Sequence, residues 1–315
     1  MSTYGGGVPR RRLGVVLLVP APVAHEVDGL RRALDDGSWQ KVAPHITLVP
    51  PINVREDELG AALAVVRAAA ASTDVLTLDL GPVETFLPVN PVVFLAVGGP
   101  SLPTVHALPA ALGDGPLARP PTHELVPHVT VADNLAEERI PGAMAALSGY
   151  RHTIVKIRHL HVLEEVRDEE DQRVWRPLMG VAFGPPAVVG RGGLETVIEV
   201  HDRVPPDAGA LGAERGPADV VLVARRAEVV VGLLGGRVRG AKAWLEWVEV
   251  DPGVEGEGVG TQLLAAYESV AADRGAERMY ARADPGARAE SFLAGRGWAR
   301  EDPPPMVRGR IGPVG

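Results

Sequence analysis

Residues 44–51 of the chain are PHITLVPP, and residues 127–133 are PHVTVAD. Both stretches contain proline, histidine, an aliphatic residue, threonine and a second aliphatic residue, and the two histidines are 83 positions apart (128 − 45 = 83). Because alternate residues of a β-strand face the same side, each histidine should share a face with the threonine two positions later. Two such strands, if brought together, would form a polar pocket of two imidazoles and two hydroxyls.

The segments around these two His-x-Thr motifs repeat a similar pattern. A strand and a helix come before each motif strand, and a helix follows it. We therefore predict two similar lobes that face each other and hold both motifs in a central groove. Asn53, with Glu56 three residues later, is typical of a capping box at the start of a helix. The expected strands lie at 13–19, around His45, at 75–80, at 91–97, around His128, at 153–164 and at 173–183, and the expected helices lie at 23–35, from Asn53 to about 71, at 103–112 and at 135–147.

The four motif side chains suit the hydrolysis of a 2′,3′-cyclic phosphate. This reaction needs a base that activates water and an acid that protonates the leaving ribose oxygen. Imidazole titrates near neutral pH, so one ring can be neutral while the other is charged. Threonine hydroxyls can hold the phosphate oxygens between the rings. We predict that His45, Thr47, His128 and Thr130 are catalytic and that they need no metal ion.

Residues 13–183 resemble the two-histidine (2H) phosphoesterase superfamily, which includes the 2′-5′ RNA ligase-like proteins and cyclic phosphodiesterases. The two motifs and the segment FLPVNPVVFLAV at 86–97 carry the resemblance. It implies a bilobal, pseudo-symmetric α+β fold with the four motif residues in the site. Members of the superfamily act on cyclic phosphates of RNA ends or of small nucleotides, and the motifs do not choose between these substrates.

The composition restricts the partners and the kind of chemistry. The 315 residues include no cysteine, which excludes disulfides, thiolate catalysis and cysteine-bound zinc. The net charge is −8, and residues 1–185 carry 16 basic and 21 acidic side chains, which leaves 16 (32 − 16) and 19 (40 − 21) for the rest. Neither half has the basic excess that long nucleic acids require, so we expect a small nucleotide or an RNA terminus as partner.

No segment has the ~20 apolar residues that span a bilayer, so we expect no membrane partner. The start of the chain, with three arginines before the apolar run 13–19, has features of a secretory signal peptide. The run is short, and Pro20 ends it, so we expect a buried first strand and a cytoplasmic protein.

The stretch GPPAVVGRGG at 184–193 is rich in proline and glycine and interrupts the hydrophobic periodicity. We predict that it is a linker between a first domain at 1–183 and a second domain at 194–315. Strands and helices are expected in both domains, so the expected fold class is a mixture of α+β and α/β. The expected strands of the second domain lie at 194–200, 219–225, 228–235, 243–250, 277–283 and 306–311, and its expected helices run from the glycine-rich turn to about 273 and from 287 to 295.

The segment VEVDPGVEGEGVGTQLLAAYESVA at 248–271 ends a strand, turns through glycines and begins a helix. Backbone N–H groups at the start of a helix bind anions, and glycines allow a pyrophosphate to come close. Glycines at this spacing also fit a flexible turn. The backbone N–H groups predicted to bind the anionic part of a cofactor are those of Gly256, Gly258, Val259, Gly260 and Thr261.

Residues 194–311 resemble the GNAT acyl-CoA N-acyltransferase fold. Val250, Pro252, the turn glycines and ARAESFLAGRGW at 287–298 carry this resemblance. It implies acetyl-CoA as cofactor, with its pantetheine beside the strand that ends at Val248 and Val250, and an amine of unknown identity as acyl acceptor.

Three positions depart from the GNAT pattern. Glu255 replaces the usual arginine or glutamine, and Glu257 nearby adds a second acid. Gly286 stands where an asparagine is often found before the last helix. Leu293 stands where a tyrosine commonly protonates the leaving thiolate. We expect the acids to weaken the binding of a polyanion. Glu246 or Glu249 could act as a base on the amine through water, or both could be solvated strand residues.

Three hypotheses follow for the whole chain. It could be a bifunctional enzyme that opens a cyclic phosphate and acylates an amine. It could be a phosphoesterase with a CoA-sensing or purely structural second domain. It could also be a protein that binds RNA ends without turnover, although its acidic charge argues against this.

Overall fold

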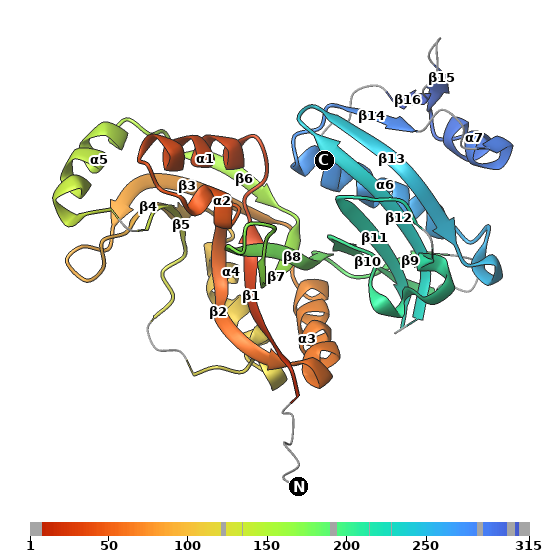
Figure 1. Ribbon diagram of the computed structural model, residues 1–315, viewed down its shortest axis with the longest axis horizontal. Coiled ribbons are helices and arrows are strands. Elements are labelled where there is room, and N and C mark those ends of the chain that lie inside the picture. Colours follow the sequence, from red (N-terminus) through yellow and green to blue (C-terminus); the bar gives the residue numbers. More distant parts are fainter. Residues whose placement is uncertain are drawn as a thin grey trace, which may run out of the picture. The chain divides into compact units, whose positions relative to one another are not determined.

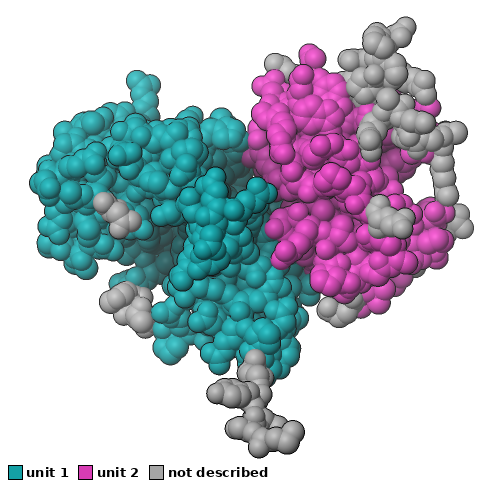
Figure 2. Space-filling view, viewed as in Figure 1, with its two compact units in different colours: residues 1–185 teal, residues 186–315 magenta. Residues whose placement is uncertain are grey.

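The computed structural model describes residues 8–120, 124–133, 135–189, 194–213, 215–227, 229–281, 286–300 and 306–308. The chain forms two compact units, residues 1–185 and residues 186–315, which are coloured separately in Figure 2. Each unit is described on its own below. No helix of the described residues is long and apolar enough to cross a membrane.

The first unit contains a sheet of four antiparallel strands in the order β8-β7-β1-β2 (Figure 1). Strand β1 is central, and its residues 13–17 are all buried, as expected for the apolar run in the sequence. Strand β2 begins at His45 and pairs with β1 alone in this unit, which makes the first motif part of an edge strand. The strands are β1 (Arg10–Leu18), β2 (His45–Arg55), β7 (His159–Arg167) and β8 (Arg173–Ala182).

A second sheet of four antiparallel strands has the order β5-β4-β3-β6. Strand β5 begins at His128 and pairs with β4 alone, so the second motif also belongs to an edge strand. The two sheets therefore present their motifs in equivalent positions, and the mixed α/β fold class is confirmed. The strands are β3 (Leu76–Thr85), β4 (Val93–Gly98), β5 (His128–Ala132) and β6 (Thr153–Ile157).

Two helices pack on the sheet to which the preceding strand in the chain does not belong. Helix α1 follows β1 in the chain but contacts β5, and helix α4 follows β4 but contacts β2. The remaining helices stay with one sheet, because α3 contacts β7 and β8, and α5 contacts β3. The helices are α1 (Val23–Ala33), α2 (Ser38–Lys41), α3 (Leu59–Ala71), α4 (Leu102–Leu112) and α5 (Ile140–Leu147), and short 3-10 turns cover Glu56–Glu58, Gly115–Leu117 and Glu137–Arg139.

Two predictions about this unit are wrong. Asn53 does not cap a helix, because β2 continues to Arg55 and Asn53 pairs with Arg12 of β1. The strand expected at 153–164 is two strands that separate at Arg158, with β6 in one sheet and β7 in the other.

The second unit contains one sheet in the order β9-β10-β11-β12-β13-β14-β16-β15. All neighbours are antiparallel except β13 and β14, which pair only from Lys242 to Leu245 of β13. Part of the expected linker, Ala187–Val189, forms β9, while residues 190–193 lie outside the described residues. The strands are β9 (Ala187–Val189), β10 (Leu194–His201), β11 (Val220–Arg226), β12 (Val229–Arg239), β13 (Lys242–Val250), β14 (Arg278–Ala281), β15 (Ala299–Arg300) and β16 (Met306–Arg308).

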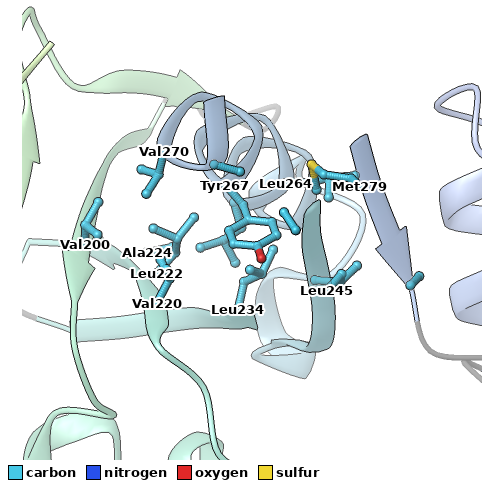
Figure 3. Close-up of a cluster of buried hydrophobic side chains, with 14 of the residues drawn as sticks. Val200, Val220, Leu222, Ala224, Leu234, Leu245, Leu264, Tyr267, Val270 and Met279 are labelled. Atoms are coloured by element: carbon cyan, nitrogen blue, oxygen red, sulfur yellow. The ribbon is translucent and has the colours of Figure 1, made fainter. Parts of the chain in front are cut away.

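Helix α6 (Val259–Asp273) covers one face of this sheet and completes the hydrophobic core shown in Figure 3. Tyr267 lies at its centre, fully buried, and its hydroxyl is within hydrogen-bond distance of two carbonyl oxygens, that of Trp244 at 2.8 Å and that of Arg237 at 3.1 Å. A Cβ at Gly236 of β12 would come within 2.2 Å of the tyrosine ring, so only glycine fits there. The other elements are a 3-10 segment at Pro206–Gly212, which packs on β12, a 3-10 turn at Pro252–Val254 and helix α7 (Gly286–Ala294).

Candidate functional site

The two His-x-Thr motifs have the alternating burial expected of strands with one polar face. Ile46 and Val129, which follow the histidines, are fully buried, whereas the histidines and threonines are partly accessible. The motif strands β2 and β5 contact each other, although they come from different sheets. The structure therefore brings His45 and Thr47 to the same region as His128 and Thr130.

Both histidine rings are held in the same way. Nδ1 of His45 lies 2.8 Å from the carbonyl oxygen of Ala43, and Nδ1 of His128 lies 2.7 Å from that of Val126. Each carbonyl belongs to the residue before the motif proline, and a residue in that position is restricted to extended conformations. Because a carbonyl can only accept, Nδ1 must carry the proton, and Nε2 of each ring remains as the nitrogen that can exchange a proton.

The surroundings of His45 favour its neutral form. Burial of the ring lowers the pKa of His45 to about 4, and the positive charges of Arg31 and His128 add to this effect. The hydrogen bond to Ala43 opposes it but is the weaker influence. His45 is therefore neutral at pH 7, and its Nε2 can accept a proton.

Two phenylalanines contact the second histidine. The rings of Phe86 and Phe94 stack with their centroids 4.1 Å apart, and their centroids lie 5.0 and 5.3 Å from that of His128. Both come from the segment 86–97, which the sequence singled out without indicating what its aromatic residues do. They hold the His128 ring from the side of β4.

The second unit contains a pocket of about 520 Å³ at the carboxyl end of β13. Six of the seven predicted cofactor-binding residues line it, and the seventh, Val259, places its side chain in the hydrophobic core instead. Beyond Leu245, β13 has no partner strand on the β14 side among the described residues, so an edge of backbone faces the pocket. The lining residues are Val248, Glu249, Val250, Glu255, Gly256, Gly258, Gly260, Thr261, Ala289, Phe292 and Arg296.

The glycine turn shapes the start of α6. Gly256 and Gly258 have φ values of 78° and 91°, a left-handed conformation that other residues adopt with strain. Gly258 is the N-cap of the helix, and no side chain caps the first N–H groups. Unsatisfied donors at a helix start, together with the positive end of the helix dipole, suit an anionic group.

Arg296 is a pocket residue that sequence reasoning missed. Its Nη2 donates to the Thr261 hydroxyl, its Nη1 donates to the Phe292 carbonyl at 2.9 Å, and its guanidinium lies 3.8 Å from the centre of the Phe292 ring. Its Nε is buried without a hydrogen-bond partner. A cation with an unsatisfied donor and a row of free backbone N–H groups fit a phosphate-bearing cofactor. In the sequence, Arg296 is one arginine of the segment 287–298, and no local feature marks it as a pocket residue.

The acids near this pocket differ in their environment. Glu257 pairs with Arg226, and Glu246 pairs with Arg237, so these two carboxylates are already neutralised by partners. Glu255 and Glu249 line the pocket, and Glu249 lies 3.5 Å from Arg215. Arg226 compensates the charge of Glu257, so Glu257 should oppose a polyanion less than the sequence alone suggests.

Leu293 is 2% exposed and packs in the core of the second unit, away from solvent. The described residues that line the pocket include no tyrosine, serine, cysteine or histidine. Proton donation to a leaving thiolate therefore has no obvious protein source among them. Elsewhere in the described part of the chain, no three histidine or acidic side chains gather as a metal site would.

Comparison with known families identifies both units. Residues 19–169 match the family model of the 2′-5′ RNA ligase superfamily, and residues 195–298 match that of the acetyltransferase (GNAT) family. The chain joins a 2′-5′ RNA ligase superfamily domain to a GNAT domain. Both resemblances drawn from the sequence are thereby confirmed.

Relatives of the 2′-5′ RNA ligase superfamily domain occur in bacilli. A Bacillus cytotoxicus protein named "Putative phosphoesterase" is 29% identical over 157 residues, which cover 49% of this chain and 90% of that protein. A Bacillus cereus protein of the same name is 28% identical over 126 residues, which cover 40% of this chain and 72% of that protein.

Solved structures similar to this chain include LigT and an N-acetyltransferase. The E. coli LigT structure in complex with 3′-AMP is 17% identical, has a TM-score of 0.42, and the match covers 56% of this chain and 99% of LigT. The PaiA N-acetyltransferase of Thermoplasma acidophilum in complex with coenzyme A is 19% identical, has a TM-score of 0.26, and the match covers 28% of this chain and 57% of PaiA.

Proposed function

We propose that the 2′-5′ RNA ligase superfamily domain is a phosphoesterase that hydrolyses a 2′,3′-cyclic phosphate on a small nucleotide or an RNA end. The observation that carries the proposal is the matched pair of histidines, each with Nδ1 bound to a carbonyl and Nε2 available for proton transfer. The relatives named as phosphoesterases agree with this class of reaction.

The different surroundings of the two rings support a division of roles. Nε2 of neutral His45 takes a proton from water, and the water oxygen attacks phosphorus. The bond between phosphorus and one ribose oxygen then breaks, and His128 donates its Nε2 proton to that oxygen. The product is a phosphomonoester with a free neighbouring hydroxyl. Thr47 and Thr130 would donate hydrogen bonds to the non-bridging oxygens, which positions the phosphorus between the rings.

The test is to follow a 2′,3′-cyclic mononucleotide by phosphorus NMR with the full chain, in the presence and absence of EDTA. We expect conversion to a phosphomonoester, unaffected by EDTA and lost in His45→Ala and His128→Ala. His106→Ala, which changes an exposed histidine on α4, is the matched control. Binding of the nucleotide without any product would support the alternative of an RNA-end binding protein and contradict our proposal.

For the GNAT domain we propose binding of acetyl-CoA in the pocket at β13. The first N–H groups of α6 and the Arg296 guanidinium would hold the phosphates, and Val248 and Val250 would lie beside the pantetheine. If the domain acylates an amine, Glu249 is the better candidate base, because it lines the pocket and Glu246 is not among the lining residues.

A second candidate for this domain is a CoA-binding module with slow or absent transfer. The position of Leu293 in the core favours it, because no tyrosine can donate a proton there. Incubation of the full chain with acetyl-CoA and a panel of simple amines separates the two. Release of CoA at several turnovers per second would contradict the slow-transfer candidate, since typical transferase turnover lies at about 1–1,000 per second.

A further inference from the structure

Arg31 of α1 is a buried charged residue that links the second motif strand, β5, to the segment before the first, β2. Its side chain is 1% exposed, and all three of its nitrogens donate hydrogen bonds. Nε and Nη2 donate to the carbonyl of Thr130 at 3.1 and 3.0 Å, and Nη1 donates to the carbonyl of Val42 at 2.8 Å. One guanidinium thus binds the backbone of the second motif and the segment that leads into the first.

The charge of Arg31 has a local partner. Nη1 also lies 3.2 Å from Oδ1 of Asp28, one turn earlier on the same helix. The guanidinium therefore satisfies two carbonyls and a carboxylate at once, a geometry that its planar fork permits and that a lysine ammonium cannot copy.

Asp36 makes a second link of the same kind, just after α1. Its carboxylate accepts the N–H of Ser38 at 2.8 Å, ahead of the first motif, and the N–H of Asp133 at 2.7 Å, at the end of the second motif. Burial alone would raise the pKa of Asp36, but these bonds and the charge of Arg31 hold it below its ordinary value. The α1 region therefore ties the two motifs together at two points.

The same network places opposite charges beside the two histidines. Arg31 acts on His45 with a positive charge. Asp133 and His128 also interact. Burial and the charge of Asp36 raise the pKa of Asp133, and the charge of His128 opposes this rise. His45, which the charge of Arg31 helps to keep neutral, is the ring that the proposed reaction uses as base.

We propose that Arg31 is a positioning residue of the two-histidine site, which sets the spacing of the two motif strands and keeps a positive charge beside His45. This inference rests on the proposed phosphoesterase function. Arg31 itself would not touch the substrate, since its nitrogens are occupied by backbone and Asp28. Its effect on catalysis would pass through the histidines.

The test compares Arg31→Lys, Arg31→Met and Arg32→Met in the full chain. Arg32 is the next residue on the helix, is exposed and lies over the Trp39 ring, so its variant is the matched control. Arg31→Lys keeps the charge but loses the fork, and we expect kcat to fall by about 10–100-fold while KM changes little. Arg31→Met also removes the charge, so the pH at which kcat/KM falls on the acid side should move upward.

A second readout does not depend on turnover. The ring of His45 is titrated by NMR, with Arg31 and His128 as the charged or titratable groups that act on it. We expect its midpoint to rise in Arg31→Met and to stay in Arg31→Lys and Arg32→Met. If the wild type hydrolyses nothing, the proposed function has failed and this titration alone decides. If Arg31→Met does not fold, Arg31→Lys decides through kcat. Arg31 variants that match Arg32→Met in kcat and in the His45 midpoint would overturn the inference.

Discussion

At the scale of single residues, the neutral state of His45 sets the pH range of the proposed reaction. Because burial and nearby positive charge lower the pKa of His45 to about 4, the base stays neutral through most of the acid range. We expect kcat/KM to remain high down to about pH 4 and to fall below it. A steady-state pH series on a 2′,3′-cyclic nucleotide measures this. A fall that begins near the ordinary histidine value of about 6.5 would contradict the assignment.

The same shift predicts a loss of stability in acid. Below pH 6.5, the ordinary pKa of histidine, His45 binds a proton in the unfolded chain but not in the folded protein. The free energy of unfolding therefore falls as the pH drops from 6.5 toward about 4. At about 1.4 kcal/mol per pH unit, this residue should cost roughly 2 kcal/mol at pH 5. His45→Gln should lose less stability between pH 7 and pH 5 than the wild type does in denaturant unfolding. An equal loss in both proteins would show that His45 titrates normally.

Arg296 carries the residue-scale prediction for the GNAT domain. Arg296→Gln removes the cation from the pocket, so acetyl-CoA should bind at least about tenfold more weakly, since a hydrogen bond to a charged group contributes about 1.5–3 kcal/mol. Glu255→Arg should strengthen binding, because it replaces an acid at the pocket with a base. Calorimetry on the full chain measures both. No heat from the wild type and none from Glu255→Arg would mean that the glycine turn binds no CoA.

Substitution of the turn glycines is a less specific test of the same pocket. Gly258→Val should abolish binding, but its φ of 91° means that valine also strains the turn. Arg296→Gln changes no backbone and is therefore the cleaner variant.

The sequence indicated the motif residues because the His-x-Thr pattern occurs twice. Arg31 and Arg296 belong to no repeated pattern. Arg31 did leave a signal, because it lies four residues after Val27 and shares the buried face of α1. An arginine on an apolar face needs a partner, but the partners here are backbone carbonyls of distant strands, and no local pattern names them. Arg296 bonds through tertiary contacts in the same way.

At the scale of elements, buried ion pairs fix the 3-10 segment Pro206–Gly212 to the sheet of the GNAT domain. Arg225 donates to Glu199, which is fully buried, and to Asp207 of that segment. Arg225→Met should destabilise the protein by about 3–5 kcal/mol, because the fully buried Glu199 carboxylate would lose its guanidinium partner. Thermal and denaturant unfolding of the full chain measure this loss.

The control for this prediction is Arg239→Met, which breaks a pair with Asp219 on the surface. An exposed pair contributes about 0–1 kcal/mol, so this variant should unfold almost as the wild type does. Equal losses in the two variants would show that the buried cluster is no stronger than a surface pair.

Hydrophobic periodicity predicted most strands and helices, but it did not predict which of them pair or pack together. The run 153–164 looks like one strand because both of its halves have apolar residues at alternate positions. The break at Arg158 arises because the two halves join different sheets, which is a tertiary effect. Asn53 has the chemistry of a cap, but pairing with Arg12 keeps it extended. No local feature of the sequence indicates that α1 packs on β5 and α4 on β2.

At the scale of the whole molecule, we expect the net charge of −8 to disfavour long nucleic acids as substrates. A protein that tracks RNA through many phosphates loses affinity steeply with salt, by about 10³–10⁵ for six to ten contacts between 50 and 200 mM. We expect kcat/KM for a cyclic mononucleotide and for an RNA oligomer with a cyclic phosphate end to be similar. Neither should change more than about threefold over that salt range. A strong preference for the oligomer that salt abolishes would contradict a substrate limited to the terminus.

The central claim is that His45 and His128 act together in one reaction. The most direct test is kcat/KM of the wild type, His45→Ala, His128→Ala and the double variant on one 2′,3′-cyclic nucleotide. Removing a general acid or base costs about 10²–10⁴-fold, and groups that act as a unit are not additive. We predict that each single variant loses at least about 10²-fold and that the double variant is hardly worse than either. A single variant close to wild-type activity, or losses that multiply fully in the double variant, would contradict the account.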